Sequence, residues 1–347
     1  MSNDVFSDNK ILHEIPFIDI RNSSLIELLK QHLDKAKELI DASKNAFGLI
    51  SRLASHLALP IGDNLSRTWL KKTKNPYFDE IEQYTKILPI KGIFALNLCY
   101  EWGCTSGAYQ YDKGVKLMRV LDWPFPALGE NIVVAHQRGG AGDFYNITWP
   151  GISGIFQAMA PGRFAAALNQ APMRRHKTGV IIDWIRNRGY VNKHQGLPPA
   201  HLLRKAFETA NNYNDAKAIL VEQPISIPAI YILGGTKTQE GCVIERLEDS
   251  VRIREIGTHN NVCAANHFES SLNDIGHGWL PRAMDSHGRA KNANLLSCEV
   301  IADNFTWFQS PIANPLSRLV IVADAAKETF SLMGTDGITP VTRLFSL

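Results

Sequence analysis

The run WGCTSG at residues 102–107 is followed by LMRVLDW at residues 117–123, and both have the composition of short β-strands. The first run carries Cys104, and the second carries Arg119 and Asp122. A hairpin between them would place a cation and a carboxylate beside the thiol, which is the setting that a reactive thiolate needs. The competing interpretation is a buried core cysteine next to an ordinary cross-strand ion pair.

The chain around these runs, from residue 90 onward, is rich in short apolar segments separated by Gly and Pro, which predicts strands in an antiparallel meander. The first segments are GIFALNLCY (92–100), CTSGAYQY (104–111), VKLMRVLDW (115–123), NIVVAHQR (131–138) and RFAAALNQ (163–170). Helices are predicted at 202–211, at 215–222 and within 283–301, and further strands at AIYILGG (229–235), GCVIERLE (241–248), VRIREI (251–256) and NNVCAANHF (260–268). Strands and helices in separate blocks predict a layered α+β architecture.

The N-terminal part is predicted to be helical. Ser24 and Glu27 have the spacing of a capping box, and apolar residues recur on one helical face over residues 24–56. Pro60 and Gly62 are expected to end that helix, and residues 65–86 to form a second helical or irregular element packed on it. We therefore predict a main domain with a helical appendage.

Composition excludes several classes of protein. The 347 residues are 45% hydrophobic with a formal net charge of +3 and no basic tract, which argues against nucleic acid as a partner. The sequence has no uninterrupted stretch of about 18 apolar residues, so stable insertion into a membrane is not expected. The first ten residues, MSNDVFSDNK, do not resemble a secretory signal, so a cytoplasmic location is expected. Five cysteines without CxxC spacing argue against a disulfide framework.

A metal site is a weaker hypothesis. His259, Cys263 and His267 are zinc-ligand types spaced by four residues, but the segment has the composition of a strand. On a strand the outer two would lie about 26 Å apart, too far for one ion. The sequence GGTKT at 234–238 lacks phosphate-loop spacing and predicts a hairpin turn. We expect neither a metal nor a cofactor.

Five blocks, in the same order, resemble acid ceramidase and N-acylethanolamine acid amidase, in the choloylglycine hydrolase superfamily of N-terminal-nucleophile hydrolases. The blocks are LNLCYEWGCTSG with MRVLDWPF, WPGISGIFQAMAPGRFAAALNQAP, YILGGTKTQEGCVIERLED, the Asn266–His267 pair, and DSHGRAKNANLL. The resemblance implies a four-layer αββα sandwich. It also implies that an inactive precursor cuts its own chain between Gly103 and Cys104. Residues 1–88, a helical segment, together with 89–103 would then form the small subunit, and 104–347 the catalytic domain.

The resemblance also implies the roles of the residues in the hairpin. Cys104 would be the nucleophile, and its own α-amine, once freed, would shuttle protons with a typical pKa of about 7.7 to 8.0. Asp122 would hold that amine, and Arg119 would lie beside the sulfur and favour its anionic form. The small Gly103 would allow the strained backbone that self-cleavage requires.

Three further residues come from the later blocks. Asn266 would donate a hydrogen bond to the tetrahedral oxyanion, and Asn169 would line the site. Arg289 matches the late arginine of the family, a buried cation that steadies the site, although Arg282 is close enough in sequence to compete for that role. From the residues alone, Asn266 would be interpreted as a turn or strand-end asparagine bonded to local backbone.

Two positions depart from the family pattern. Val120 stands where many relatives have asparagine, which we expect to change packing only. Gln170 follows Asn169 where the ceramidase branch usually has glutamate, so a titratable group is missing and an acidic pH preference does not transfer simply.

The function implied is hydrolysis of the linear amide of an N-acyl amide through an acyl thioester, on N-acylethanolamine-, ceramide-, conjugated bile-salt- or penicillin V-like substrates. Apolar segments at 149–164 and 278–281 are candidates for the acyl slot. The two fragments are expected to stay associated, and a homo-oligomer is left open. The alternatives are an acyltransferase of the isopenicillin N acyltransferase type and a non-catalytic ligand-binding protein that keeps the fold.

Overall fold

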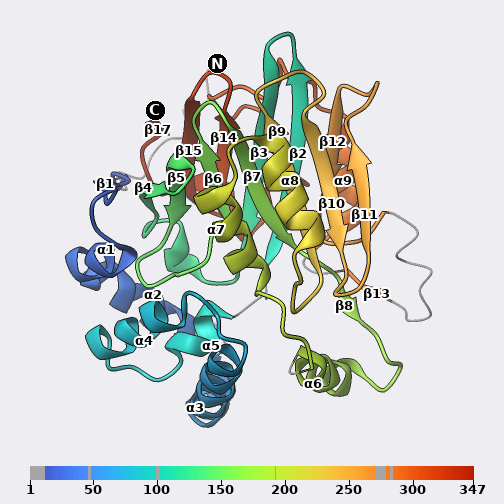
Figure 1. Cartoon of the computed structure of the whole chain (residues 1–347). Helices are drawn as coiled ribbons and strands as arrows, with labels where there is room; N and C mark the ends of the chain where they lie inside the picture. The colour runs from blue at the N-terminus through green and yellow to red at the C-terminus, as the bar shows by residue number, and fades with distance from the viewer. Residues whose placement is uncertain (1–11, 46–47, 99–101, 192, 270–278, 282–283) are drawn as a thin grey trace, which may run out of the picture.

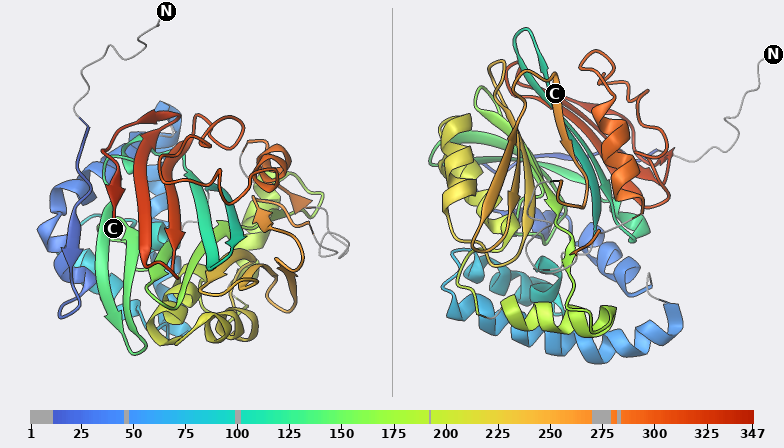
Figure 2. Two further views of the ribbon diagram at one scale, coloured as in Figure 1. Left: turned by 90° about the horizontal axis from the view of Figure 1, so that it is seen from above. Right: turned by 90° about the vertical axis from the view of Figure 1, so that its right-hand side faces the viewer.

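The computed structural model describes residues 12–45, 48–98, 102–191, 193–269, 279–281 and 284–347. Two β-sheets face one another, and helices cover the outer face of each, so the molecule has four layers (Figures 1 and 2). Helices α7 (Pro199–Thr209) and α8 (Tyr213–Glu222) cover one sheet, and α9 (Ser286–Asn294) covers the other. This arrangement is the predicted αββα sandwich.

The first sheet has eight strands in the order β1-β4-β5-β6-β7-β9-β10-β11. Their bounds are Phe17–Asp19, Val133–Gly139, Gly142–Thr148, Gln157–Ala160, Phe164–Gln170, Ala229–Gly235, Gly241–Arg246 and Val251–Glu255. The pairs are antiparallel except β1 with β4. The central strands β7 and β9 are buried along their whole length because a sheet covers one face and helices cover the other.

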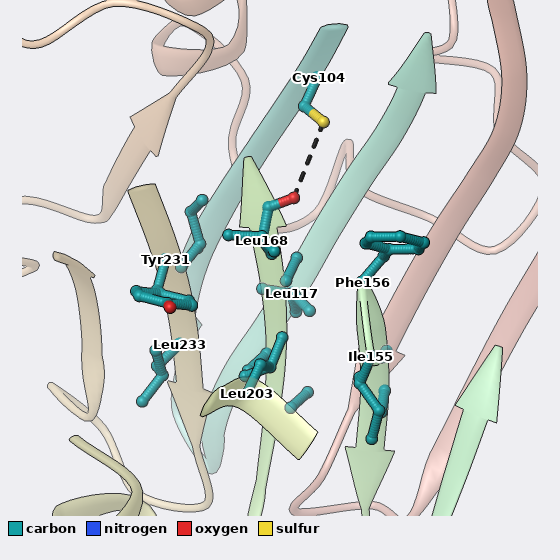
Figure 3. Packing of buried hydrophobic residues seen from close by; sticks show 14 of the residues in the cluster. Cys104, Leu117, Ile155, Phe156, Leu168, Leu203, Tyr231 and Leu233 are labelled. Atoms are coloured by element: carbon teal, nitrogen blue, oxygen red, sulfur yellow. Dashed lines mark hydrogen bonds between the residues drawn. The ribbon is translucent and has the colours of Figure 1, made fainter. Parts of the chain in front are cut away.

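The second sheet contains the predicted hairpin. Its order is β12-β2-β3-β14-β15-β16, and β17 also pairs with β15. The bounds are Asn261–Ala264, Gly103–Tyr111, Gly114–Asp122, Ser317–Asp324, Thr329–Asp336, Thr339–Pro340 and Phe345–Ser346. A separate small sheet joins β8 (Met173–Arg174) to β13 (Trp279–Leu280). Figure 3 shows the apolar core between the two main sheets, with Cys104 at one end of it.

The N-terminal helices gather at one end of the sandwich (Figure 1). They are α1 (Leu25–Gln31), α2 (Leu33–Asn45), α3 (Gly48–Lys72), α4 (Phe78–Ile87) and α5 (Ile93–Asn97). The region up to residue 88 is not helical alone, because β1 joins the first sheet beside β4. Among the described helices, none is long and apolar enough to cross a bilayer.

The predicted single helix over 24–56 is wrong in three respects. The helix is broken at His32, and Ser24 caps α1 through no side-chain hydrogen bond. The third helix also passes through Pro60 and Gly62 to Lys72. Proline removes one helical hydrogen bond, at a cost of about 3 kcal/mol in a helix interior. Packing of the later turns offsets that cost, because Trp69 and Leu70 are buried against the neighbouring helices. The second helical element predicted within 65–86 corresponds to the end of α3 and to α4.

The strand predicted at GIFALNLCY is a second error. Residues Ile93–Asn97 form α5, because Oδ1 of Asp63 accepts the backbone N–H groups of Phe94 (2.7 Å) and Ala95 (3.2 Å) at its first turn. Residues 99–101 of that run lie outside the described residues.

The predicted meander is not one sheet. The hairpin β2–β3 belongs to the second sheet, whereas β4 to β7 belong to the first, and the chain crosses between them through the short helix η1 (Pro126–Leu128). Strands β5 and β6 and helix α6 (Val180–Val191) were not predicted. The helices at 202–211 and 215–222, the four later strands and the turn at 234–238 are confirmed, and the last helix is shorter than predicted.

Candidate active site

The hairpin β2–β3 brings Cys104 and Arg119 together. Gly103 pairs with Asp122 and Ser106 with Arg119 in the register of the two strands. Cys104 and Ser106 lie on the same face of β2 because side chains alternate along a strand. An Nη of the Arg119 guanidinium lies 3.2 Å from Cys104 Sγ. The predicted hairpin is confirmed.

Arg119 is held in place by the facing strand β7. One of its nitrogens donates to the carbonyl of Leu168 (2.9 Å) and to Oδ1 of Asn169 (2.9 Å). The Ser106 hydroxyl donates to the same Oδ1 (2.7 Å). Asn169 in turn donates to the carbonyls of Ala264 and Ala265. The structure therefore places Asn169 behind the guanidinium, where it fixes the orientation of Arg119.

The backbone nitrogen of Cys104 also has a specific partner. It donates to Oδ1 of Asn266 at 2.7 Å, and the Nδ2 of Asn266 donates to the carbonyl of Gln170 at 2.9 Å. Asn266 thus holds the nitrogen that a cut before Cys104 would free. Its predicted role as an oxyanion donor stays a prediction, since its amide nitrogen is occupied in the uncut chain.

Arg289 reaches the site from the first turns of α9. Its guanidinium donates to the carbonyl of Cys104, to Oγ1 of Thr105 (2.8 Å) and to Oδ1 of Asn266 (2.9 Å). It is fully buried, as predicted for the late arginine. Arg282 lies outside the described residues.

Asp122 lies beside this cluster, and its two carboxylate oxygens have different surroundings. Its Oδ1 accepts the Ser317 hydroxyl at 2.7 Å. Its Oδ2 lies 3.5 Å from the Arg289 guanidinium and has no hydrogen-bond donor among the described residues. A buried carboxylate oxygen in that state is a ready acceptor for an additional N–H group.

Burial and the nearby positive charges act in opposite directions on the pKa of the Cys104 thiol. Burial raises the pKa of Cys104 above its ordinary value, Arg119 and Arg289 act to lower it, and the negative charge of Asp122 raises it. Burial is the largest effect, so the net shift is upward. The predicted preference for the anion is therefore outweighed in the uncut chain, and the thiol needs a base to lose its proton.

Gln170 and several hydroxyl groups were not predicted as parts of this site. Oε1 of Gln170 accepts the backbone N–H of Trp102 at 2.8 Å, on the other side of the Gly103–Cys104 bond from Asn266. Ser106 could have been found from the alternation along β2, since it lies two residues after Cys104. Ser317 carries no local signal, because its place depends on the pairing of β14 with β3. Val120 packs in a separate apolar cluster.

The residues weighed as zinc ligands have other partners. Cys263 Sγ lies 3.2 Å from the Tyr109 hydroxyl, and Nδ1 of His267 lies 2.7 Å from the Ser286 hydroxyl. Among the described residues no group of three or more His, Cys, Asp or Glu side chains is arranged to hold a metal ion.

Comparisons with known proteins identify relatives. No family model matches the chain. Acid ceramidase of Heterocephalus glaber is 28% identical over 209 residues, which is 54% of this chain and 51% of the relative. The Bos taurus protein is 30% identical (49% and 47%), and the Homo sapiens protein 26% (62% and 58%). The chain thus spans about half the length of these curated relatives.

The chain was also compared with solved structures. An N-acylethanolamine-hydrolyzing acid amidase ortholog of Caenorhabditis elegans has a TM-score of 0.49 and 17% identity, covering 64% of this chain and 93% of that chain. Conjugated bile acid hydrolase of Clostridium perfringens has a TM-score of 0.46 and 8% identity, covering 70% and 92%. By its sequence matches, the chain is a relative of the acid ceramidases.

Proposed function

We propose that this protein is a self-processing cysteine amidohydrolase that cleaves the linear amide of N-acyl amides. The observation that carries the proposal is the environment of Cys104. Its sulfur lies 3.2 Å from a buried guanidinium, and Asn266 holds its nitrogen at 2.7 Å. Arg289 binds its carbonyl. A structural cysteine in an apolar core has no need of charged or polar partners at all three positions.

The first reaction is the cut before Cys104. The thiol sulfur attacks the carbonyl carbon of Gly103, the C–N bond to Cys104 breaks, and the departing nitrogen takes up a proton to become an amine. The Gly103 acyl group is then a thioester on Sγ. Water hydrolyses this thioester, releasing a carboxylate on Gly103 and restoring the thiol.

The freed amine is the base for later turnovers. It has a typical pKa of about 7.7 to 8.0, close to neutral working conditions. Two acceptors support its placement: Oδ1 of Asn266 already accepts from this nitrogen, and Oδ2 of Asp122 is an acceptor with no hydrogen-bond donor among the described residues. In each turnover the amine takes the thiol proton and passes it to the leaving amine of the substrate. The acyl thioester that remains is hydrolysed by water.

The surroundings of the sulfur favour an apolar acyl group. Trp102 packs on Trp123 and Phe156 with ring centroids 5.1 Å and 4.8 Å apart, and Trp149 lies 6.5 Å from Trp123. These rings belong to the same buried cluster as Cys104. Cys104 itself is fully buried in the uncut chain, so substrate reaches it only after the segment that ends at Gly103 moves. Withdrawal of Trp102 would then uncover the rings of Trp123 and Phe156 on which it packs.

The proposal is tested by incubating the purified protein with N-acyl ethanolamines, ceramides, bile-salt conjugates and penicillin V. We expect release of free acid and amine, and an acyl adduct on the 104–347 fragment after an acid quench. Cys104→Ala should lose both. Cys242→Ala is the matched control, because Cys242 is also buried in a strand but lies in the other sheet. Hydrolysis by Cys104→Ala at the wild-type rate would overturn the proposal.

A further inference from the structure

Ser286 and His267 form a polar pair directly behind Asn266. The backbone N–H of Asn266 donates to the Ser286 hydroxyl at 2.8 Å, and Nδ1 of His267 lies 2.7 Å from the same oxygen. Both side chains are almost completely buried. Neither belongs to the catalytic group described above, so their contacts need a separate explanation.

Two residues in the first turns of α9 form hydrogen bonds with Asn266, one to its main chain and one to its side chain. Ser286 and Arg289 are three residues apart, and therefore lie on the same side of the helix. Ser286 accepts the main-chain N–H of Asn266, while Arg289 donates to its side-chain Oδ1 at 2.9 Å. That Oδ1 also binds the nitrogen of Cys104. The placement of the Cys104 nitrogen therefore depends on the Ser286 contact.

Among the residues that the structure describes, the hydrogen of the Ser286 hydroxyl has one evident acceptor. The hydroxyl oxygen accepts from Asn266, and its own hydrogen finds a partner when it donates to Nδ1 of His267. This arrangement requires a neutral His267 ring with its proton on Nε2. That nitrogen lies 3.7 Å from Oε1 of Glu269, which fits the same tautomer.

Protonation of His267 would reverse this contact. Nδ1 would then carry a hydrogen, the Ser286 hydroxyl would lose its acceptor, and a buried O–H would be left without a partner among the described residues. The charged groups that face His267 act in both directions: Glu269 favours the cation, and His287, whose ring centroid lies 3.8 Å away, opposes it when charged. The Glu269 carboxylate lies 3.2 Å from Arg254, and this positive charge weakens the electrostatic effect of Glu269 on His267. Arg289 adds positive charge on the far side of Asn266, and Asp285 contributes negative charge next to His287.

We infer that Ser286 and neutral His267 are positioning residues that hold Asn266 against the nitrogen of Cys104, and that a proton on His267 releases this hold and slows turnover. The inference rests on the proposed function, since it concerns the amine that acts there as base. The acid side of the activity profile then depends on His267 as well as on the α-amine.

The test is the pH dependence of kcat/KM for wild type, His267→Asn and His287→Asn. In His267→Asn the side-chain Oδ1 can accept from Ser286 where Nδ1 does now, but it cannot titrate. On the acid side of the profile, log kcat/KM of wild type should fall by more than one decade per pH unit, because protonation of the α-amine and a proton on His267 both slow turnover. In His267→Asn it should fall by one, with activity at pH 8 within about threefold of wild type. His287→Asn should keep the steep wild-type slope, because His287 is a neighbour without a bond to Ser286.

Ser286→Ala gives an independent readout. It should lower kcat by about tenfold or more with little change in KM, and Ser286→Thr should restore most of the loss because it keeps the hydroxyl. Equal one-decade slopes in wild type and His267→Asn, with wild type active, would overturn this inference alone. Wild-type protein that neither cuts itself nor hydrolyses amides would instead overturn the proposed function.

Discussion

At the scale of single residues, self-cleavage at Cys104 is expected to depend on the Arg119 guanidinium, which makes several hydrogen bonds at once. Arg119 contacts the sulfur, the Leu168 carbonyl and Asn169 from two different nitrogens. Lysine has one ammonium and cannot reproduce that fork. We therefore expect Arg119→Lys to slow self-cleavage by about tenfold or more, since one charge-assisted hydrogen bond contributes about 1.5 to 3 kcal/mol.

The measurement is the fraction of cut chain against time, read from a denaturing gel. Arg343→Lys is the matched control, because its guanidinium pairs with Glu14 in an exposed position. A wild-type rate in Arg119→Lys would show that the guanidinium does not assist the sulfur.

Gln170 offers a test of charge beside the sulfur. A glutamate there would carry a negative charge at neutral pH, raise the pKa of the nearby thiol further and oppose its ionisation. As the pH falls and that glutamate takes up a proton, the opposition disappears. Gln170→Glu should therefore cut itself faster at pH 5 than at pH 8 when each rate is divided by the wild-type rate at the same pH. Gln223→Glu, at the end of α8, should show no such reversal.

Among single residues, sequence reasoning reached the site unevenly. Cys104, Arg119 and Asp122 lie within 20 residues of one another, so a hairpin is enough to bring them together. Asn266 and Arg289 were identified only through the family resemblance. Their approach to Cys104 depends on β12 pairing with β2 and on α9 packing over that pair, which no local pattern encodes.

At the scale of elements, α7 contains a buried histidine, His201, that makes the stability of the folded chain depend on pH. Burial, with a smaller effect from Arg204, lowers the pKa of His201 to about 3, and Nδ1 of His201 is bonded to Asn75 at 3.0 Å. The unfolded chain takes up a proton at this residue below its ordinary pKa of about 6.5, and the folded chain does not. This part of the stability is fully present above pH 6.5 and is lost as the pH falls toward 3.

We therefore expect the free energy of unfolding to fall by up to about 1.4 kcal/mol per pH unit between pH 6 and 4 from this residue. In His201→Gln, most of this pH-dependent fall in the free energy of unfolding should disappear. The comparison is made by urea unfolding of the uncut Cys104→Ala protein with and without His201→Gln. Parallel pH dependences would contradict the assignment.

Two elements show where sequence patterns fail. The run GIFALNLCY has strand composition, yet Asp63 from a distant helix binds the N–H groups at its start and α5 forms instead. The long helix α3 passes through Pro60 because Trp69 and Leu70 beyond it are buried. In both cases a tertiary contact outweighs a local preference. Strands such as β9 were predicted correctly because burial on both faces leaves a continuous apolar run in the sequence.

At the scale of the whole molecule, a partly buried ion-pair cluster joins the two proposed fragments. Arg204 of α7 binds both oxygens of Glu80 in α4, at 2.7 Å and 3.0 Å, and also binds Glu208 at 2.8 Å. The Tyr77 hydroxyl donates to Glu208 at 2.7 Å. After the proposed cut, α4 belongs to the small fragment and α7 to the large one, so this cluster would help to keep them together.

Removing one partner of a fully buried ion pair typically costs about 3 to 5 kcal/mol, and the partial exposure of Glu80 and Glu208 makes the cost smaller here. Arg204→Met should therefore make the cut fragments separate at a lower urea concentration on size-exclusion chromatography. Arg67→Met, which removes the more exposed pair with Glu82, should change the separation little. Identical separation in both variants would show that other contacts hold the fragments.

The central claim is that the amine of residue 104 must be set free, and intact-mass measurement of freshly purified wild-type protein tests it most directly. We predict two masses, for residues 1–103 and for a second fragment that begins with an unmodified Cys104, and a single full-length mass for Cys104→Ala. A single full-length mass from a wild-type preparation that hydrolyses amides would contradict the account.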